Sequence, residues 1–222
     1  QGKCLYYIKR YDEAWMLMNQ ALDIAIQIDS KKQIVACHKQ LYYLCREFKR
    51  MMNERGDEQA STLFFRESLL HEMYFSEKPR LAELTVRYEA LRCDIMQQYY
   101  MNKDYDNVIR IATSLDIHDD ADPNASCLVY YYKAQAYVKL ENYPMAKEAF
   151  FRELELRKKY LGWEEEDTIL ACQNLGVLHS FCNEREEALA CFREAYGYEV
   201  KKNGEDSEMA QKLLQYISVV ES

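Results

Sequence analysis

The residues of this 222-residue chain that could carry out chemistry include four histidines and eight cysteines. His71 is followed by a glutamate, but Phe75 stands where a zinc-protease helix has its second histidine. Cys37, His38 and Cys45 share one helix-like segment, without the C-x-x-C spacing typical of zinc sites. These spacings predict no metal site, and we expect His71 to have a structural or surface role.

An acidic segment at 116–122 has the carboxylate density of a calcium loop. However, Ala121 and Cys127 stand where an EF-hand loop needs glycine and glutamate, so we expect a solvated link. The chain also has no glycine-rich phosphate loop and no G-x-S-x-G nucleophile motif. We therefore expect no enzymatic activity, no cofactor and no bound metal.

The composition favours helices as the elements that position any site. Only six glycines and three prolines interrupt the chain, while the residues that favour helices are plentiful. The hydrophobic share of 49% is large enough for a substantial core. The composition thus predicts an almost entirely helical protein.

Charge and hydropathy exclude several classes of partner. The net charge of −8 and the lack of a Lys/Arg cluster argue against direct binding of nucleic acid. No apolar run reaches the roughly 18 residues that cross a bilayer, so we expect no membrane insertion. The cysteines lie in helix-like apolar patterns, which favours a reducing compartment, the cytoplasm. Because the chain begins with Gln1, we expect a fragment of a longer protein.

A sequence repeat indicates how these helices are arranged. Residues 146–150 (Ala-Lys-Glu-Ala-Phe) correspond to residues 188–192 (Ala-Leu-Ala-Cys-Phe), and a small residue, Ala134 or Gly176, stands twelve positions before each segment. Between the small residue and the alanine, a polar segment such as that around Pro144 ends one amphipathic helix and begins the next. The pattern predicts two antiparallel helices per repeat.

This pattern resembles the tetratricopeptide repeat (TPR), and Leu175, Gly176, Ala188 and Phe192 form the best copy. The second-helix anchors are Ala14, Ala60, Val108, Ala146 and Ala188. Their intervals of 46, 48, 38 and 42 residues exceed the standard unit of about 34. The last two repeats are similar to the longer repeats of the kinesin-light-chain type.

The resemblance implies one all-α domain over residues 1–222, a right-handed superhelical solenoid of about five hairpins plus a C-terminal helix. We expect the hairpins at 1–30, 33–75, 80–117, 126–161 and 167–203, and the last helix at 206–220. Gly2 matches the helix-crossing position of the first hairpin. In the second, Phe48 is too large for a close crossing, which predicts longer helices or a shifted turn near 55–57.

In TPR proteins the first helix of each hairpin lines a concave groove that receives extended peptides. Asn174 resembles the family's asparagine that hydrogen-bonds a peptide backbone, and a carboxamide can both donate and accept. Helical spacing then extends the expected binding face to Tyr131, Tyr132, Gln135, Val177, Phe181 and Gln97. The alternatives are a solvated surface position for Asn174 and core packing for the aromatic residues.

Four tyrosines gather on the first helix of the fourth hairpin. Tyr130 and Tyr137 occupy aromatic positions of the repeat, so we expect them in the core. Tyr131 and Tyr132 are rotated by roughly 100° and 200° from Tyr130 about the helix axis, which directs them toward the groove or the next repeat.

Two functional hypotheses follow. The first is a non-catalytic scaffold that binds a protein or an extended peptide in the groove. The alternative is a sensory or regulatory segment of a larger bacterial signalling protein, a kinase or transcription regulator, controlled by ligand binding or self-association. If a terminal helix leaves an apolar edge uncovered, we also expect homo-oligomers that stack end to end.

Overall fold

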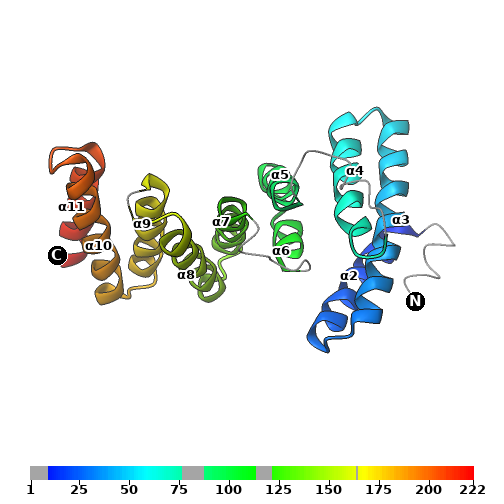
Figure 1. The fold of residues 1–222 in the computed structure, drawn as a ribbon, viewed down its shortest axis with the longest axis horizontal. Coiled ribbons are helices and arrows are strands. Elements are labelled where there is room, and N and C mark those ends of the chain that lie inside the picture. Colours follow the sequence, from blue (N-terminus) through cyan, green and yellow to red (C-terminus); the bar gives the residue numbers. More distant parts are fainter. Residues whose placement is uncertain (1–9, 77–87, 114–121, 164) are drawn as a thin grey trace. The chain divides into compact units, whose positions relative to one another are not determined.

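The computed structural model describes residues 10–76, 88–113, 122–163 and 165–222. These residues form ten α-helices and no strand (Figure 1). The all-α, TPR-like fold expected from the sequence is confirmed at this level. Contacts divide the chain into two compact units, Gln1–Asp116 and Ile117–Ser222, which are described separately.

The first unit contains five described helices, each packed on the next. They are α2 (Tyr11–Gln27), α3 (Lys31–Arg55), α4 (Glu58–Glu72), α5 (Tyr88–Met101) and α6 (Tyr105–Thr113). Gly56 caps the end of α3 with a left-handed φ of 76°. Asp57 caps the start of α4, where its side chain accepts a hydrogen bond from the Ala60 N–H at 2.9 Å. The turn therefore lies at 55–57.

The long helix α3, with 25 residues, packs against its neighbours through an aromatic cluster. The ring of Phe48 stacks on Phe64 with centroids 5.0 Å apart and meets Trp15 edge to face at 5.6 Å. Phe48 of α3 therefore packs against both α2 and α4. The longer helix and the turn near 55–57 agree with the expectation from Phe48.

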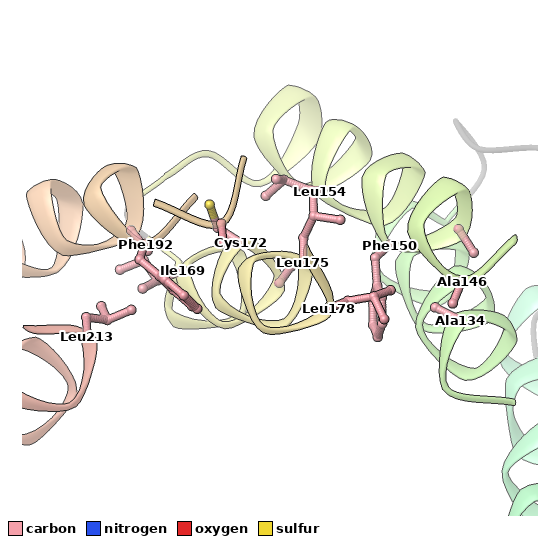
Figure 2. Close-up of a cluster of buried hydrophobic side chains, with 14 residues drawn as sticks. Ala134, Ala146, Phe150, Leu154, Ile169, Cys172, Leu175, Leu178, Phe192 and Leu213 are labelled. Carbon is pink, nitrogen blue, oxygen red and sulfur yellow. The ribbon is translucent and has the colours of Figure 1, made fainter. Parts of the chain in front are cut away.

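The second unit contains five further helices, again packed in chain order (Figure 1). They are α7 (Pro123–Lys139), α8 (Tyr143–Tyr160), α9 (Glu166–Phe181), α10 (Arg185–Asn203) and α11 (Glu208–Glu221). Their core joins residues of all five helices, and Figure 2 shows Phe150 of α8 beside Leu178 of α9. Such contacts between neighbours are the basis of stability in helical repeat proteins.

One turn geometry recurs in three hairpins and also in the link between α2 and α3, at Asp29 (φ 49°). The second residue after the first helix has a left-handed backbone: Lys103 (φ 60°), Glu141 (φ 59°) and Asn183 (φ 59°). The N–H of the following residue donates to a carbonyl five positions earlier, at 2.9 Å in each hairpin: Asp104 to Tyr99, Asn142 to Tyr137 and Glu184 to His179. These bonds satisfy carbonyls at the end of the first helix.

The small residues of the repeat lie where helices cross. Ala134, Ala146 and Ala188 are completely buried. A Cβ built on Gly176 would lie 2.8 Å from Cε1 of Phe192, closer than real Cβ atoms come to other heavy atoms. α9 and α10 therefore approach each other closely at this glycine.

Some expectations lie outside the described residues, namely those for Gly2 and for most of the acidic segment at 116–122. In the described ranges, none of the helices combines the length and the hydropathy that a membrane span requires.

Candidate functional site

A groove of about 400 Å³ opens on the second unit. It lies between the C-terminal half of α7, α8 and the C-terminal half of α9. Its lining residues are Gln135, Val138, Lys139, Glu141, Tyr143, Phe150, Asn174, Val177, Leu178 and Phe181. Four of the expected binding residues, Gln135, Asn174, Val177 and Phe181, thus lie around one hollow.

The groove has an apolar floor and an exposed apolar side. Phe150 and Leu178 are 2% and 5% exposed and belong to the core (Figure 2). Val177 and Phe181 are 40% and 70% exposed, so the groove has apolar surface open to solvent. The ring of Tyr143 lies 5.5 Å from that of Phe181, so α8 and α9 both contribute aromatic surface.

Two carboxamides face this surface from different helices. Gln135 of α7 and Asn174 of α9 are both partly exposed. Within the described part of the chain, neither side chain has a hydrogen-bond partner. The neighbouring Gln173, by contrast, is buried at 5% exposure. The available amides are therefore those of Gln135 and Asn174.

The distribution of the α7 tyrosines between core and surface differs from that expected from the sequence. Tyr131 and Tyr132 pack edge to face with centroids 5.4 Å apart and do not line the groove. Tyr131 also packs against the core of the second unit, as Tyr137 does. Tyr130 was expected in the core, but it is only partly buried and lines a separate hollow beside Phe151.

Gln97 lies in the first compact unit. It is exposed on α5 and lines a hollow of about 700 Å³ formed with α4 and the turn before it. Gln98, Asn102 and Asp57 share this hollow, which is richer in polar groups than the groove on the second unit. Gln97 therefore lines a hollow of the first unit.

Tyr143 is one of the groove residues that were not expected from the sequence. A tyrosine three positions before the second-helix anchor also occurs at Tyr11 and Tyr105. The ring of Tyr105 lies 5.5 Å from that of Tyr100 on the preceding helix, so the position places an aromatic ring against a neighbouring helix. This recurrence was the signal that could have identified Tyr143.

A second arrangement with chemical potential is buried in the first unit. His38 and Cys45 of α3 lie near Glu67 and His71 of α4, and all four side chains are fully buried. Nδ1 of His38 lies 2.8 Å from Nδ1 of His71, and one ring must donate to the other. Cys45, Glu67 and His71 each offer one potential ligand atom, and these atoms lie within 4.8 Å of one another.

The ionisation of this buried group is set by burial and one cation. Burial acts to raise the pKa of Glu67, but the Arg110 guanidinium, the neighbouring His71 ring and the hydrogen bond from Tyr99 lower it to about 2. Burial lowers the pKa of His38 to about 2, helped by the charges of His71 and Arg110. Burial also raises the pKa of the Cys45 thiol well above its usual value. The buried cluster therefore contains the carboxylate of Glu67, paired with the guanidinium of Arg110, and two neutral histidines.

The successive hairpins and their recurring turn define a helical repeat protein. No protein-family model matches the sequence, and no curated protein matches it. Among solved structures, the crystal structure of BtubC (BKLC) from P. vanneervenii is similar, with a TM-score of 0.56 and 13% sequence identity. The match covers 95% of this chain and 82% of BtubC. BtubC is itself a helical repeat protein, and at this identity the likeness shows the fold alone.

Proposed function

We propose that this chain is a non-catalytic scaffold and that the groove on its second unit binds an extended peptide segment of a partner protein. The observation that carries the proposal is the pair of uncommitted carboxamides, Gln135 and Asn174, on two different helices of one groove. A helical repeat fold supports a protein-interaction role at the level of the fold.

The chemistry of the groove suits a peptide. Each carboxamide can donate to a peptide carbonyl and accept from a peptide N–H, which an extended backbone leaves unpaired. The exposed side chains of Val177 and Phe181 offer apolar surface to a large apolar side chain of the ligand. Lys139 and Glu141 stand on the rim with opposite charges, so the groove does not select a strongly charged peptide.

A random peptide library displayed on phage, selected against the full chain, tests this function. We expect the selected peptides to share one large apolar residue. Asn174→Ala and Gln135→Ala should each weaken binding of a selected peptide about threefold to tenfold, the value of one hydrogen bond. Val177→Asp should weaken it further, because the aspartate would place an unpaired charge against an apolar side chain.

Gln20→Ala is the matched control, because Gln20 is an exposed amide on α2 of the first unit. Its dissociation constant should equal that of the wild type. The proposal is wrong if the library yields no binder, or if Asn174→Ala and Val177→Asp, both shown to be folded by circular dichroism, bind the selected peptides unchanged.

A further inference from the structure

The buried group of the first unit has the composition of a metal site. Glu67 and His71 are four positions apart on α4 and therefore lie on one face of that helix. Cys45 lies on α3, which packs against α4. Two rigid helices thus bring a thiol, a carboxylate and an imidazole together, with all three side chains fully buried.

The distances are close to those of a coordination sphere. The three potential ligand atoms lie within 4.8 Å of one another, and Nε2 of His71 is 3.6 Å from Oε1 of Glu67. A tetrahedral zinc ion with bonds of about 2.0–2.3 Å holds its ligand atoms roughly 3.5 Å apart. The three ligand atoms must therefore draw somewhat closer together to close the sphere.

The surrounding residues orient these ligands. Nδ1 of His71 lies 2.8 Å from Nδ1 of His38, while Nε2 of His71 is buried without a hydrogen-bond partner among the described residues. If His71 donates from Nδ1, the lone pair on Nε2 is left free, and this is the usual arrangement of a metal-binding histidine. The ring of His38 is held in turn by stacking on Tyr74, with centroids 3.7 Å apart.

Glu67 is oriented in the same way. The hydroxyl of Tyr99 donates to Oε2 at 2.6 Å, and the Arg110 guanidinium donates to Oε1 at 2.6 Å. Each carboxylate oxygen has a second lone pair, so these bonds fix the carboxylate and leave it able to bind a metal ion. A group whose only task was to pair with Arg110 would not require the thiol and the free imidazole nitrogen beside it.

We propose that Cys45, Glu67 and His71 form a three-ligand site for a zinc ion. Zinc is the common biological ion that accepts thiolate, imidazole and carboxylate together. On binding, Zn²⁺ takes the place of the thiol proton of Cys45, which is released to solvent. The thiolate and the carboxylate then carry two negative charges against the three positive charges of the ion and the Arg110 guanidinium, so the site keeps one net positive charge. A small ligand such as water completes the tetrahedron.

Cobalt(II) and zinc titrations of the full, chelator-treated chain test the site. We expect one equivalent of Co²⁺ to produce a thiolate-to-cobalt charge-transfer band in the near ultraviolet and one equivalent of Zn²⁺ to remove it. Cys45→Ser should abolish this band. His38→Phe removes only the residue that orients His71 and should weaken the metal affinity about tenfold to a hundredfold.

Cys37→Ser is the matched control, since Cys37 is a free, half-buried cysteine on the same helix. It should keep the band. The proposal is overturned if the wild-type chain gives no band, if Cys45→Ser keeps it, or if Cys37→Ser removes it. Circular dichroism shows whether each variant is folded. If Cys45→Ser does not fold, the presence or absence of the band in the wild-type chain decides whether the proposed site exists.

Discussion

Gly176 of α9 lies directly against the ring of Phe192 of α10. A Cβ built on this glycine would lie 2.8 Å from Cε1 and 2.9 Å from Cδ1 of the ring, and 3.0 Å from Cβ of Cys191. The two helices therefore rely on the missing side chain for their separation, because protein interiors are packed too densely to admit one more methyl group freely.

Gly176→Ala should destabilise the second unit. Overpacking typically costs about 1–3 kcal/mol, while the better helix propensity of alanine offsets up to about 1 kcal/mol. We expect a net loss of about 1–2 kcal/mol in the free energy of unfolding by urea. Trp163 and Trp15 are the two tryptophans of the chain, so a Trp15→Phe background lets Trp163 fluorescence report on the second unit.

Gly197→Ala provides the comparison for Gly176→Ala. Gly197 is inside α10, and a Cβ added there would meet no atom within 4 Å. This variant should gain about 0.5–1 kcal/mol, because alanine loses less conformational entropy in a helix than glycine does. Equal effects of the two substitutions would contradict the packing argument.

Gly176 also shows what the sequence could predict. Its interval of twelve residues to Ala188 matches that from Ala134 to Ala146, and this regularity is enough to locate the crossing positions. The exception was informative as well, since Phe48 at the same interval from Ala60 predicted the longer helix α3. Because each helix crossing requires a small residue, small residues recur at a fixed interval, and this recurrence makes the hairpins recognisable in the sequence.

The sites were harder to predict, because they depend on which face of each helix is covered. Asn174 and Gln135 were identified from one face of two helices, but Tyr131 on the same face turned toward the core. The buried Glu67 was not singled out, because a glutamate in a helix is normally expected at the surface. The proposed metal site therefore differs from the expectation of no metal.

The recurring hairpin turn gives a second prediction. Glu141 has a φ of 59°, a left-handed conformation that costs a residue with a side chain about 1 kcal/mol relative to glycine. Glu141→Gly should therefore stabilise the second unit by up to about 1 kcal/mol in urea unfolding followed by Trp163 fluorescence.

Glu148→Gly is the control for Glu141→Gly, because Glu148 is an exposed residue in the interior of α8. It should destabilise the unit by about 1 kcal/mol, the usual cost of glycine in a helix. Loss of stability in both variants would show that the backbone at Glu141 is not strained.

A third prediction concerns the ion pair between Arg110 and Glu67, whose facing atoms lie 2.6 Å apart. Arg110→Met would leave the carboxylate of Glu67 buried and uncompensated, so we expect a loss of about 3–5 kcal/mol. Trp15 fluorescence in a Trp163→Phe background measures the unfolding of the first unit. Adding Glu67→Gln to Arg110→Met should recover part of the loss, because a neutral amide needs no counter-charge.

The surface pair between Arg193 and Glu221 is the control for the buried pair. Its atoms are also 2.6 Å apart, but the two side chains are 61% and 49% exposed. Arg193→Met should change the stability of the second unit by less than about 1 kcal/mol. A similar loss in Arg110→Met and Arg193→Met would mean that burial does not decide the strength of these pairs.

The fourth prediction is a pH dependence in the second unit. Glu153 is 1% exposed, its Oε1 accepts a hydrogen bond from Arg157 at 2.8 Å, and its Oε2 has no partner among the described residues. Burial raises the pKa of Glu153 from 4.5 to about 7, against the opposing charge of Arg157. The folded state therefore holds a proton that the unfolded state releases between these two values.

Because the folded state binds this proton more tightly, the contribution of Glu153 to stability falls as the pH rises from 4.5 to about 7. The loss amounts to at most about 3 kcal/mol, at 1.36 kcal/mol per pKa unit. Urea unfolding from about pH 5 to about pH 8, followed by Trp163 fluorescence, measures it. Glu153→Gln cannot titrate, so its stability should decline less over this range than that of the wild type. Parallel curves for the two proteins would show that Glu153 is ionised in the folded state throughout, with Arg157 outweighing its burial.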